Sequence, residues 1–341
     1  ILQKDIWSIS SFLENKEYRF NKENILTHLP EKFIEEAIEV ISSWKSYSPT
    51  PLIKLNKLDK ELKLKNIYYK DEDKRFDLKS FKALGGAFAV YKIASEKKNI
   101  TVSTATAGNH GRSVAWGAQR LGLECKIFIS ENVSESRAAA MRDLGADVIR
   151  VKGNYDNSLK ECIDQSNKNK WEIVQDVSWD GYKEVPKLIM AGYTIMIKEI
   201  LDEIDSNSIT HVFLQAGVGG MAAAMIAGFA KLSKNVPKFI VIEPENADCV
   251  FKSIQNNKPT SIDIKKETVM GGMSCGDVSS IAWEILKNST NYCMTIPDNA
   301  ISTAVALLAE SRFSDEKIIG GECAVPGLIA LIGSFNNKEY L

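Results

Sequence analysis

Lys82 is the residue in this sequence whose setting most clearly suggests chemistry. It follows a strand-like stretch at 66–70 and a charged segment, and it opens an amphipathic pattern that contains Phe81, Leu84 and Phe88. Apolar surroundings lower the pKa of a lysine from about 10.4 toward that of a usable nucleophile. Such a lysine can form a Schiff base with a carbonyl compound. The alternative is a surface lysine whose stem packs on Phe81.

A glycine-rich turn is the second candidate. It follows an apolar stretch at 211–215, precedes an alanine-rich helical pattern, and consists of Gly217, Val218, Gly219, Gly220 and Met221. Glycines let the backbone approach a ligand closely, and the start of a helix favours a phosphate. The spacing is not that of a Rossmann fingerprint, and no Walker lysine follows. A structural turn and a dinucleotide loop remain alternatives.

A third candidate is the turn formed by Thr106, Ala107, Gly108, Asn109 and His110. A hydroxyl, an amide and backbone donors converge in it, which suits a carboxylate or a ring oxygen. A helix N-cap made by Thr106 or Asn109 is the alternative. Because both turns follow predicted strands, ligand binding at the carboxyl ends of parallel strands is expected.

The elements that must position these residues alternate between strand and helix. Parallel sheets with right-handed crossovers are therefore expected, in an α/β fold. The expected strands are 67–69, 100–103, 126–129, 147–151, 172–174, 211–215 and 238–242, and the expected helices are 31–44, 80–96, 111–121, 134–144, 156–168, 186–202 and 221–232.

Composition excludes several classes of function. The 341 residues are 44% hydrophobic and 26% charged with a net charge of −1, so neither nucleic acid nor an anionic membrane is an expected partner. Six scattered cysteines and three histidines predict reduced thiols and no metal site. The start of the sequence lacks a basic-then-apolar leader, and a cytoplasmic protein is expected.

Lys82 and the two turns, taken together at their spacing, resemble fold-type II pyridoxal-phosphate enzymes, the relatives of threonine dehydratase and tryptophan synthase β. Within that group the sequence is similar to the 2,3-diaminopropionate ammonia-lyases from about residue 45 to 330. The matching segments are Lys70-Asp71-Glu72, Arg75-Phe76, Phe81-Lys82, Leu84-Gly85-Gly86, Gly108-Asn109-His110-Gly111-Arg112, Val114-Ala115-Trp116, Asn154-Tyr155-Asp156, Gln175-Asp176, Trp179, Gly181-Tyr182, Pro186, Leu214-Gln215-Ala216-Gly217-Val218-Gly219, Glu243-Pro244, Ala247-Asp248-Cys249, Ser274-Cys275-Gly276, Trp283-Glu284 and Gly321-Glu322.

The resemblance implies an architecture and a cofactor. Two three-layer domains with largely parallel sheets are expected, a large one from 1–84 and 196–341 and a small one from 85–195, with pyridoxal 5'-phosphate between them. A homodimer acting on a small amino acid is also implied. The family's Ser/Thr-Glu-Gly motif, which contacts the pyridine nitrogen, is not found in the 341 residues.

The resemblance also assigns roles. Lys82 would bond to the cofactor, Asn109 would hold its ring oxygen, and Gly217, Val218, Gly219, Gly220 and Met221 would bind its phosphate. Thr106, Ala107 and His110 would flank the substrate. Asp176 matches a family aspartate beside the substrate's amino group, and we expect it to protonate the leaving amine.

One departure from the family bears on stereochemistry. The family has an aspartate where this sequence has Ala107, and that aspartate is implicated in proton removal from the D-isomer. Lys82 is then the remaining base, and a preference for L-substrates is expected. The predicted reaction is elimination of ammonia from 2,3-diaminopropionate to give pyruvate. A serine, threonine or hydroxy-amino-acid dehydratase is the nearest alternative, and a non-catalytic ligand-binding homologue is another.

Overall fold

The computed structural model describes residues 6–336 and Tyr340, which fall into two compact units. Unit 1 takes in the described residues of 1–30, 49–73 and 196–341, and unit 2 those of 31–48 and 74–195. These bounds differ from the expected ones because 31–48 and 74–84 group with the smaller unit. Helix α2 packs on α4 and α8 of that unit, which accounts for the first difference.

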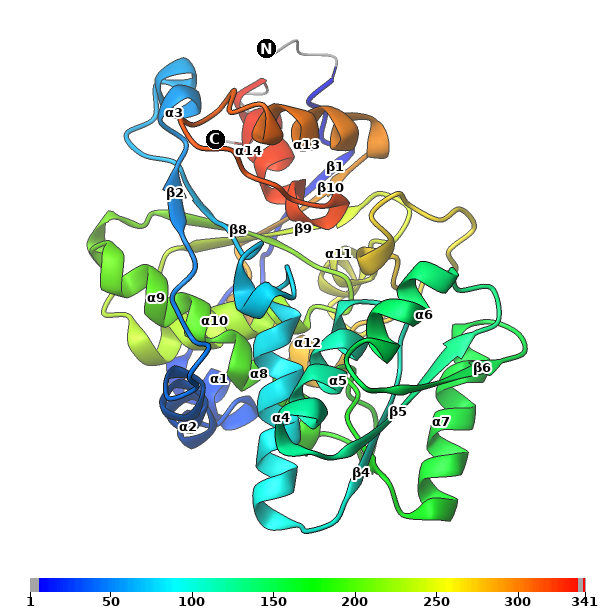
Figure 1. The fold of residues 1–341 in the computed structure, drawn as a ribbon. Helices are drawn as coiled ribbons and strands as arrows, with labels where there is room; N and C mark the ends of the chain where they lie inside the picture. Colours follow the sequence, from blue (N-terminus) through cyan, green and yellow to red (C-terminus); the bar gives the residue numbers. More distant parts are fainter. Residues whose placement is uncertain (1–5, 337–339, 341) are drawn as a thin grey trace. The chain divides into compact units, whose positions relative to one another are not determined.

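Unit 2 is built on a parallel four-stranded sheet in the order β6-β5-β4-β7 (Figure 1). Its strands are β4 (Thr101–Ala105), β5 (Glu124–Ser130), β6 (Asp147–Val151) and β7 (Glu172–Ile173). Its helices are α2 (Glu31–Ser42), α4 (Lys82–Glu96), α5 (Asn109–Leu121), α6 (Glu135–Arg142), α7 (Tyr155–Asn169) and α8 (Glu184–Tyr193), with a short 3-10 turn at Arg75–Asp77.

One face of this sheet is covered by α7. Phe128 of β5 and Ala105 of β4 pack against Cys162 of that helix, and the Ser103 and Ser166 hydroxyls are 2.7 Å apart. Side chains alternate between the faces of a strand, so Thr104 points to the opposite face. The carboxyl end of β4 is followed by the turn that connects it to α5. The candidate residues 106–110 lie in this turn and at the start of the helix.

Unit 1 is built on a mixed four-stranded sheet in the order β1-β10-β9-β8, in which only β1 runs antiparallel. A two-stranded ladder, β2 with β3, belongs to the same unit. The strands are β1 (Ser11–Glu14), β2 (Leu52–Lys54), β3 (Tyr68–Lys70), β8 (His211–Gln215), β9 (Lys238–Pro244) and β10 (Tyr292–Ile296). The helices are α1 (Lys22–His28), α3 (Asn56–Leu62), α9 (Ile195–Glu203), α10 (Gly220–Leu232), α11 (Cys249–Gln255), α12 (Ser280–Ser289), α13 (Ile301–Ala309) and α14 (Pro326–Asn336).

Alternating residues of β9 supply the two cores of unit 1. Ile240 and Ile242 join the cluster that includes α13 and α14. Phe239, on the other face, meets Phe229 of α10 with ring centroids 5.6 Å apart. Both faces of the central strand are therefore apolar, which is why parallel strands read as continuous hydrophobic runs.

Most expected elements between 67 and 242 are present with ends shifted by a few residues. The expected single helix 186–202 is wrong, because the chain forms α8 and α9 with Thr194 between them. The Thr194 hydroxyl donates to the carbonyl oxygen of Ala191 at 2.6 Å, a local bond that competes with regular helix. None of the helices that the structure describes has the length and apolar character needed to cross a membrane.

Candidate active site

Lys82 is the first residue of α4. Its backbone N–H donates to the Ser80 hydroxyl at 3.2 Å, which satisfies one of the free donors at the helix start. The helix behind it is buried along Ala83 to Val90, so its first turn is fixed in place. The local sequence thus places a long cationic side chain at the end of a rigid, buried helix.

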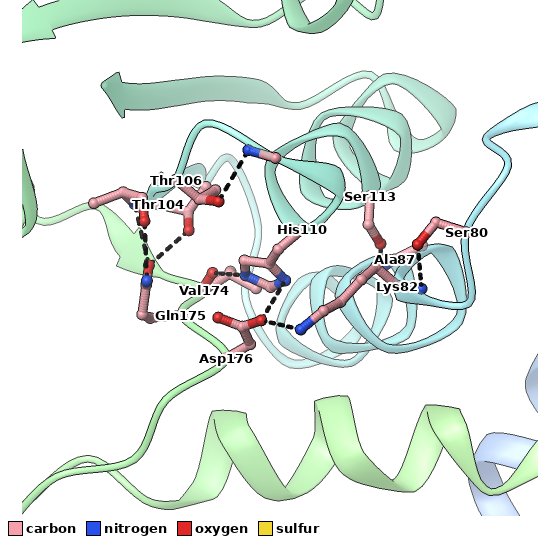
Figure 2. A network of polar contacts seen from close by, with 12 residues as sticks. Ser80, Lys82, Ala87, Thr104, Thr106, His110, Ser113, Val174, Gln175 and Asp176 are labelled. Atoms are coloured by element: carbon pink, nitrogen blue, oxygen red, sulfur yellow. Dashed lines mark hydrogen bonds and ion pairs between the residues drawn. The ribbon is translucent and has the colours of Figure 1, made fainter. Parts of the chain in front are cut away.

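The Lys82 ammonium forms an ion pair with Asp176, in the loop after β7, with Nζ 2.5 Å from Oδ2 (Figure 2). Burial alone would lower the pKa of Lys82, but the attraction of Asp176 and contact with Tyr193 raise it above its ordinary value. The expectation that apolar surroundings lower this pKa is therefore wrong while Lys82 is free. The sequence could not show it, because Asp176 lies 94 residues away along the chain.

Asp176 is ionised near neutral pH. Burial would raise the pKa of its carboxyl, but His110 and Lys82 hold it well below the usual range. A carboxylate of this kind attracts cations and donates no proton of its own. The expected general-acid role thus requires that Asp176 first receive a proton.

His110 is the third member of this cluster. Figure 2 shows its ring between the Val174 backbone and Asp176. Nε2 donates to the carbonyl oxygen of Val174 at 2.8 Å, and Nδ1 lies 3.8 Å from Asp176 Oδ2. Burial lowers the pKa of His110, although the neighbouring Asp176 carboxylate opposes that shift. Within the described residues, Nδ1 has no hydrogen-bond partner.

The backbone beside Asp176 is held by Gln175. Its side-chain amide donates to the carbonyl oxygen of Ala105 at 2.9 Å and accepts from the Thr104 hydroxyl at 2.8 Å. Its own N–H donates to the Tyr182 hydroxyl at 2.8 Å. These bonds tie the loop that carries Asp176 to β4, and so fix the carboxylate next to Lys82.

The remaining residues of the turn lie beside His110. Thr106 accepts from the Gly108 N–H at 3.3 Å, a local turn bond. Asn109 is exposed at the start of α5, and its side-chain oxygen is 3.5 Å from Arg112 Nη1. Ala107 is half-buried and presents only a methyl group. The structure thus brings Lys82, Asp176 and His110 together and places the others on the same turn.

Tyr193 is a residue of this site that sequence reasoning missed. Its ring centroid lies 5.7 Å from Lys82 Nζ, and the ring meets Phe81 edge-on at 5.0 Å. Its hydroxyl is buried and lacks a hydrogen-bond partner in the part of the chain the structure describes, and burial raises its pKa. The position depends on α4 and α8 packing closely, which no sequence motif signals.

The glycine-rich turn belongs to unit 1 and opens α10. Gly219 adopts a φ of +87°, a conformation that favours glycine. A Cβ on Gly217 would lie 3.0 Å from Cys275 Sγ and 3.2 Å from the Gly272 carbonyl oxygen, whereas one on Gly220 would meet nothing within 4 Å. The first turn of α10 has no side-chain cap and no acidic residue. Its free N–H groups and dipole suit a phosphate.

Each of these two sets of residues suits one group of a cofactor, the amine a carbonyl group and the turn a phosphate. Lys82 of unit 2, half-buried and with a charged partner, would supply the amine, and the uncapped start of α10 in unit 1 would supply phosphate donors. With two mainly parallel sheets, the chain has an α/β fold, and a lysine in such a setting can bond to a cofactor that carries a carbonyl group.

The chain belongs to the family described as pyridoxal-phosphate dependent enzyme, whose family model matches residues 44–338. The expected cofactor and the tryptophan synthase β-like, fold-type II architecture are thereby confirmed. The family contains both ammonia-lyases and dehydratases.

The similar proteins include diaminopropionate ammonia-lyases. That of Escherichia coli (strain K12) is 34% identical over 303 residues, 83% of this chain and 76% of the relative, and that of Salmonella typhimurium is 33% identical over 324 residues, 86% of this chain and 80% of the relative. A crystal structure of the E. coli enzyme in complex with an aminoacrylate-PLP azomethine reaction intermediate superposes with a TM-score of 0.88 at 31% identity, covering 98% of this chain and 89% of that one. An L-threonine dehydratase of Haemophilus influenzae is 28% identical over 213 residues, 62% of this chain and 39% of the relative.

Proposed function

We propose that this enzyme is an ammonia-lyase that acts on a 2,3-diamino acid, with L-2,3-diaminopropionate as its substrate. One water is consumed, and the products are one pyruvate and two ammonia. Similarity to diaminopropionate ammonia-lyases over most of the chain supports the reaction class. The observation that carries the choice of substrate is the half-buried, ionised carboxylate of Asp176 beside Lys82.

Asp176 needs a cation. With Lys82 free, the ammonium provides it, at 2.5 Å. If Lys82 is bonded to the cofactor, the carboxylate loses that partner, and a carboxylate largely shielded from water is destabilised without a cation beside it. A second ammonium group on the substrate would replace the lost cation, whereas the hydroxyl of serine or threonine carries no charge. The site thus favours a diamino acid over a hydroxy acid.

Lys82, Asp176 and His110 each have a different part in the proposed reaction. Pyridoxal phosphate supplies the electron sink for the carbon that loses its proton. Lys82 Nζ, when it is free of the cofactor and uncharged, would take the α-proton. Asp176 Oδ2 would hold the β-amino group as an ammonium, which needs no further proton to leave as ammonia. His110 Nδ1, 3.8 Å from Oδ2, would help to position the substrate's amino group near the carboxylate.

The other assignments complete the proposal. Gly217, Val218, Gly219, Gly220 and Met221 would bind the phosphate through the start of α10, and Asn109 would bind the ring oxygen. Thr106 and Ala107 would flank the substrate. The proposal includes a homodimer, which light scattering of the purified protein tests directly.

A second candidate, an L-serine or L-threonine dehydratase, is favoured by one observation. The turn Ala107-Gly108-Asn109-His110 lacks the acidic residue of the diaminopropionate family and is similar to that of the dehydratases. The relatives include such an enzyme, at 28% identity over a shorter stretch.

The test compares substrates and a variant of Asp176. Wild-type kcat/KM should be higher for L-2,3-diaminopropionate than for L-serine or L-threonine. Asp176→Asn keeps the shape and removes the charge, so it should lower kcat/KM for the diamino acid at least about 100-fold and for L-serine by less than about tenfold. Pyruvate or 2-oxobutanoate formation is measured in steady state.

The experiment includes two control variants. Asp180→Asn removes the charge of an exposed aspartate in the same loop and should leave both substrates unaffected. Lys82→Ala should abolish turnover and the visible absorbance that borohydride bleaches in the wild type. Better turnover of L-serine, or an equal loss for both substrates in Asp176→Asn, contradicts the proposed substrate. No turnover of any amino acid would indicate a non-catalytic homologue.

A further inference from the structure

A cavity of about 630 Å³ in unit 2 is lined by none of the residues assigned to the reaction. We call it the tryptophan pocket, and its lining residues are Lys45, Ser46, Ser48, Lys74, Phe76, Asp77, Trp116 and Arg120. It is open to solvent, and its volume is within the range of small-molecule sites.

The base of this pocket is a stack of aromatic rings. Phe76 and Trp116 are stacked with centroids 4.6 Å apart and an interplanar angle of 27°. Trp44, behind them, lies 5.6 Å from Phe76 and 5.8 Å from Trp116. All three rings are half-buried, so they offer a rigid apolar surface against which another ring can stack.

The rim of the pocket is cationic. Lys45, Lys74 and Arg120 contribute three positive charges and Asp77 one negative charge, in a chain whose net charge is −1. None of the three cations has a carboxylate within ion-pair distance in the ranges that the structure describes, whereas many other lysines are paired. The guanidinium carbon of Arg120 lies 4.4 Å from the ring centroid of Trp44 and 4.6 Å from that of Trp116. That stacking leaves its N–H donors free for an anion.

One wall of the pocket is conformationally strained. Phe76 and Asp77 adopt φ values of +51° and +57°, in the left-handed region. For an aromatic residue this conformation is a genuine outlier. Backbone strain of this kind is common in ligand-binding segments, where the surrounding structure maintains the strained conformation. Both residues line the pocket, so the strain shapes its wall.

From these observations we infer that the tryptophan pocket binds a small aromatic anion, a planar ring that carries a phosphate or a carboxylate. The ring stacks on Phe76, Trp116 and the Arg120 guanidinium, and the anionic group meets Lys45, Lys74 and Arg120. This site goes beyond the proposed function, because it needs neither Lys82 nor the phosphate-binding turn at 217–221.

Calorimetric titration of the pyridoxal-phosphate-loaded holoenzyme with phenyl phosphate tests the inference, since the bound cofactor already fills the catalytic phosphate site. Phenyl phosphate should bind saturably at one site per chain. Inorganic phosphate lacks the ring and phenol lacks the anionic group. Each should therefore bind at least about tenfold more weakly than phenyl phosphate. Titration with benzoate shows whether the site prefers a carboxylate or a phosphate on the ring. Binding of either aromatic anion supports the site.

Variants locate the binding. Lys45→Ala with Lys74→Ala should weaken phenyl phosphate at least about tenfold, and so should Arg120→Ala, because each removes charge from the rim. Lys160→Ala with Lys168→Ala removes the same charge from exposed positions of α7 and should change nothing. All these variants should keep wild-type activity without ligand.

Three results would overturn the site. The first is the absence of saturable binding by either aromatic anion. The second is equal weakening in the α7 control. The third is a change of oligomeric state in the rim variants without any ligand binding, which would show that this surface is a contact between subunits.

Discussion

At the scale of single residues, the chemistry depends on a charge balance among Lys82, Asp176 and His110. Asp176 raises the pKa of Lys82, and Lys82 and His110 together hold the pKa of Asp176 down. A lysine in this state is an ammonium until the pair is broken. In our proposal a bond between Lys82 and the cofactor breaks the pair, and a second ammonium group on the substrate then takes the place of Lys82 beside Asp176.

Substitution of Ala107 tests the expected preference for L-substrates. Ala107→Asp restores a carboxylate to the turn between β4 and α5, where the resembled family has one. We expect turnover of D-2,3-diaminopropionate to rise at least about tenfold, since a positioned base contributes on the order of 10²–10⁴ to a proton transfer. Chiral steady-state assays of both isomers measure it.

The matched control is Ala107→Asn, which has the same shape and no charge, and it should give no gain on the D-isomer. If the wild type already turns over both isomers equally, the idea that Ala107 sets the stereochemical preference is wrong.

At the scale of elements, two glycines determine how closely α4 and α8 approach. A Cβ on Gly85 would lie 2.5 Å from the Ile189 carbonyl oxygen and from Tyr193 Cε1, and one on Gly192 would lie 2.8 Å from Gly85 Cα. Backbone atoms cannot move aside cheaply. These contacts bring the Tyr193 ring to Lys82, so the packing of two helices determines the surroundings of the reactive amine.

Gly85→Ala should therefore destabilise unit 2. Overpacking against backbone costs about 1–3 kcal/mol, more than the helix propensity gained by alanine, about 1 kcal/mol. The free energy of unfolding, from denaturant titration, should fall accordingly.

The comparison for this variant is Gly108→Ala. Gly108 has a φ of −124° and an added Cβ there would meet nothing within 4 Å, so stability should stay within about 0.5 kcal/mol of wild type. Equal stability of Gly85→Ala and wild type would show that the helices can separate without cost.

At the scale of the whole molecule, stability should depend on pH through Glu243. This carboxyl is buried in unit 1 and accepts hydrogen bonds from the N–H groups of Val250 at 2.9 Å and Phe251 at 2.6 Å. Burial raises its pKa to about 8 despite these bonds. Between the unfolded pKa, about 4.3, and this value, the folded chain holds a proton that the unfolded chain lacks.

Because the folded chain holds this extra proton, a higher pH favours the unfolded chain. The free energy of unfolding should fall as pH rises from about 5 to 8, by on the order of 1.4 kcal/mol per unit at most. Glu243→Gln does not titrate, so its stability should fall less steeply over the same range. Parallel pH profiles of the variant and the wild type would show that Glu243 does not carry the effect.

Much of the architecture could be predicted because it depends on local patterns. Apolar stretches at 211–215 and 238–242 became β8 and β9, since a strand buried on both faces must be apolar along its length. The break at Thr194 was missed because a single side-chain bond decides it. The site residues were proposed from motifs, and their roles stay predictions until the variants are measured.

The sequence by itself determined the family, the cofactor, the alternation of strands and helices, and the turns that hold Lys82 and Gly217–Gly220, because these depend on residues close together in the chain. Only the tertiary structure decided the charge state of Lys82, the place of the Tyr193 ring beside it and the aromatic base of the tryptophan pocket. Each of these depends on side chains from distant segments, and their Coulomb energies and packing exist only at the distances that folding creates.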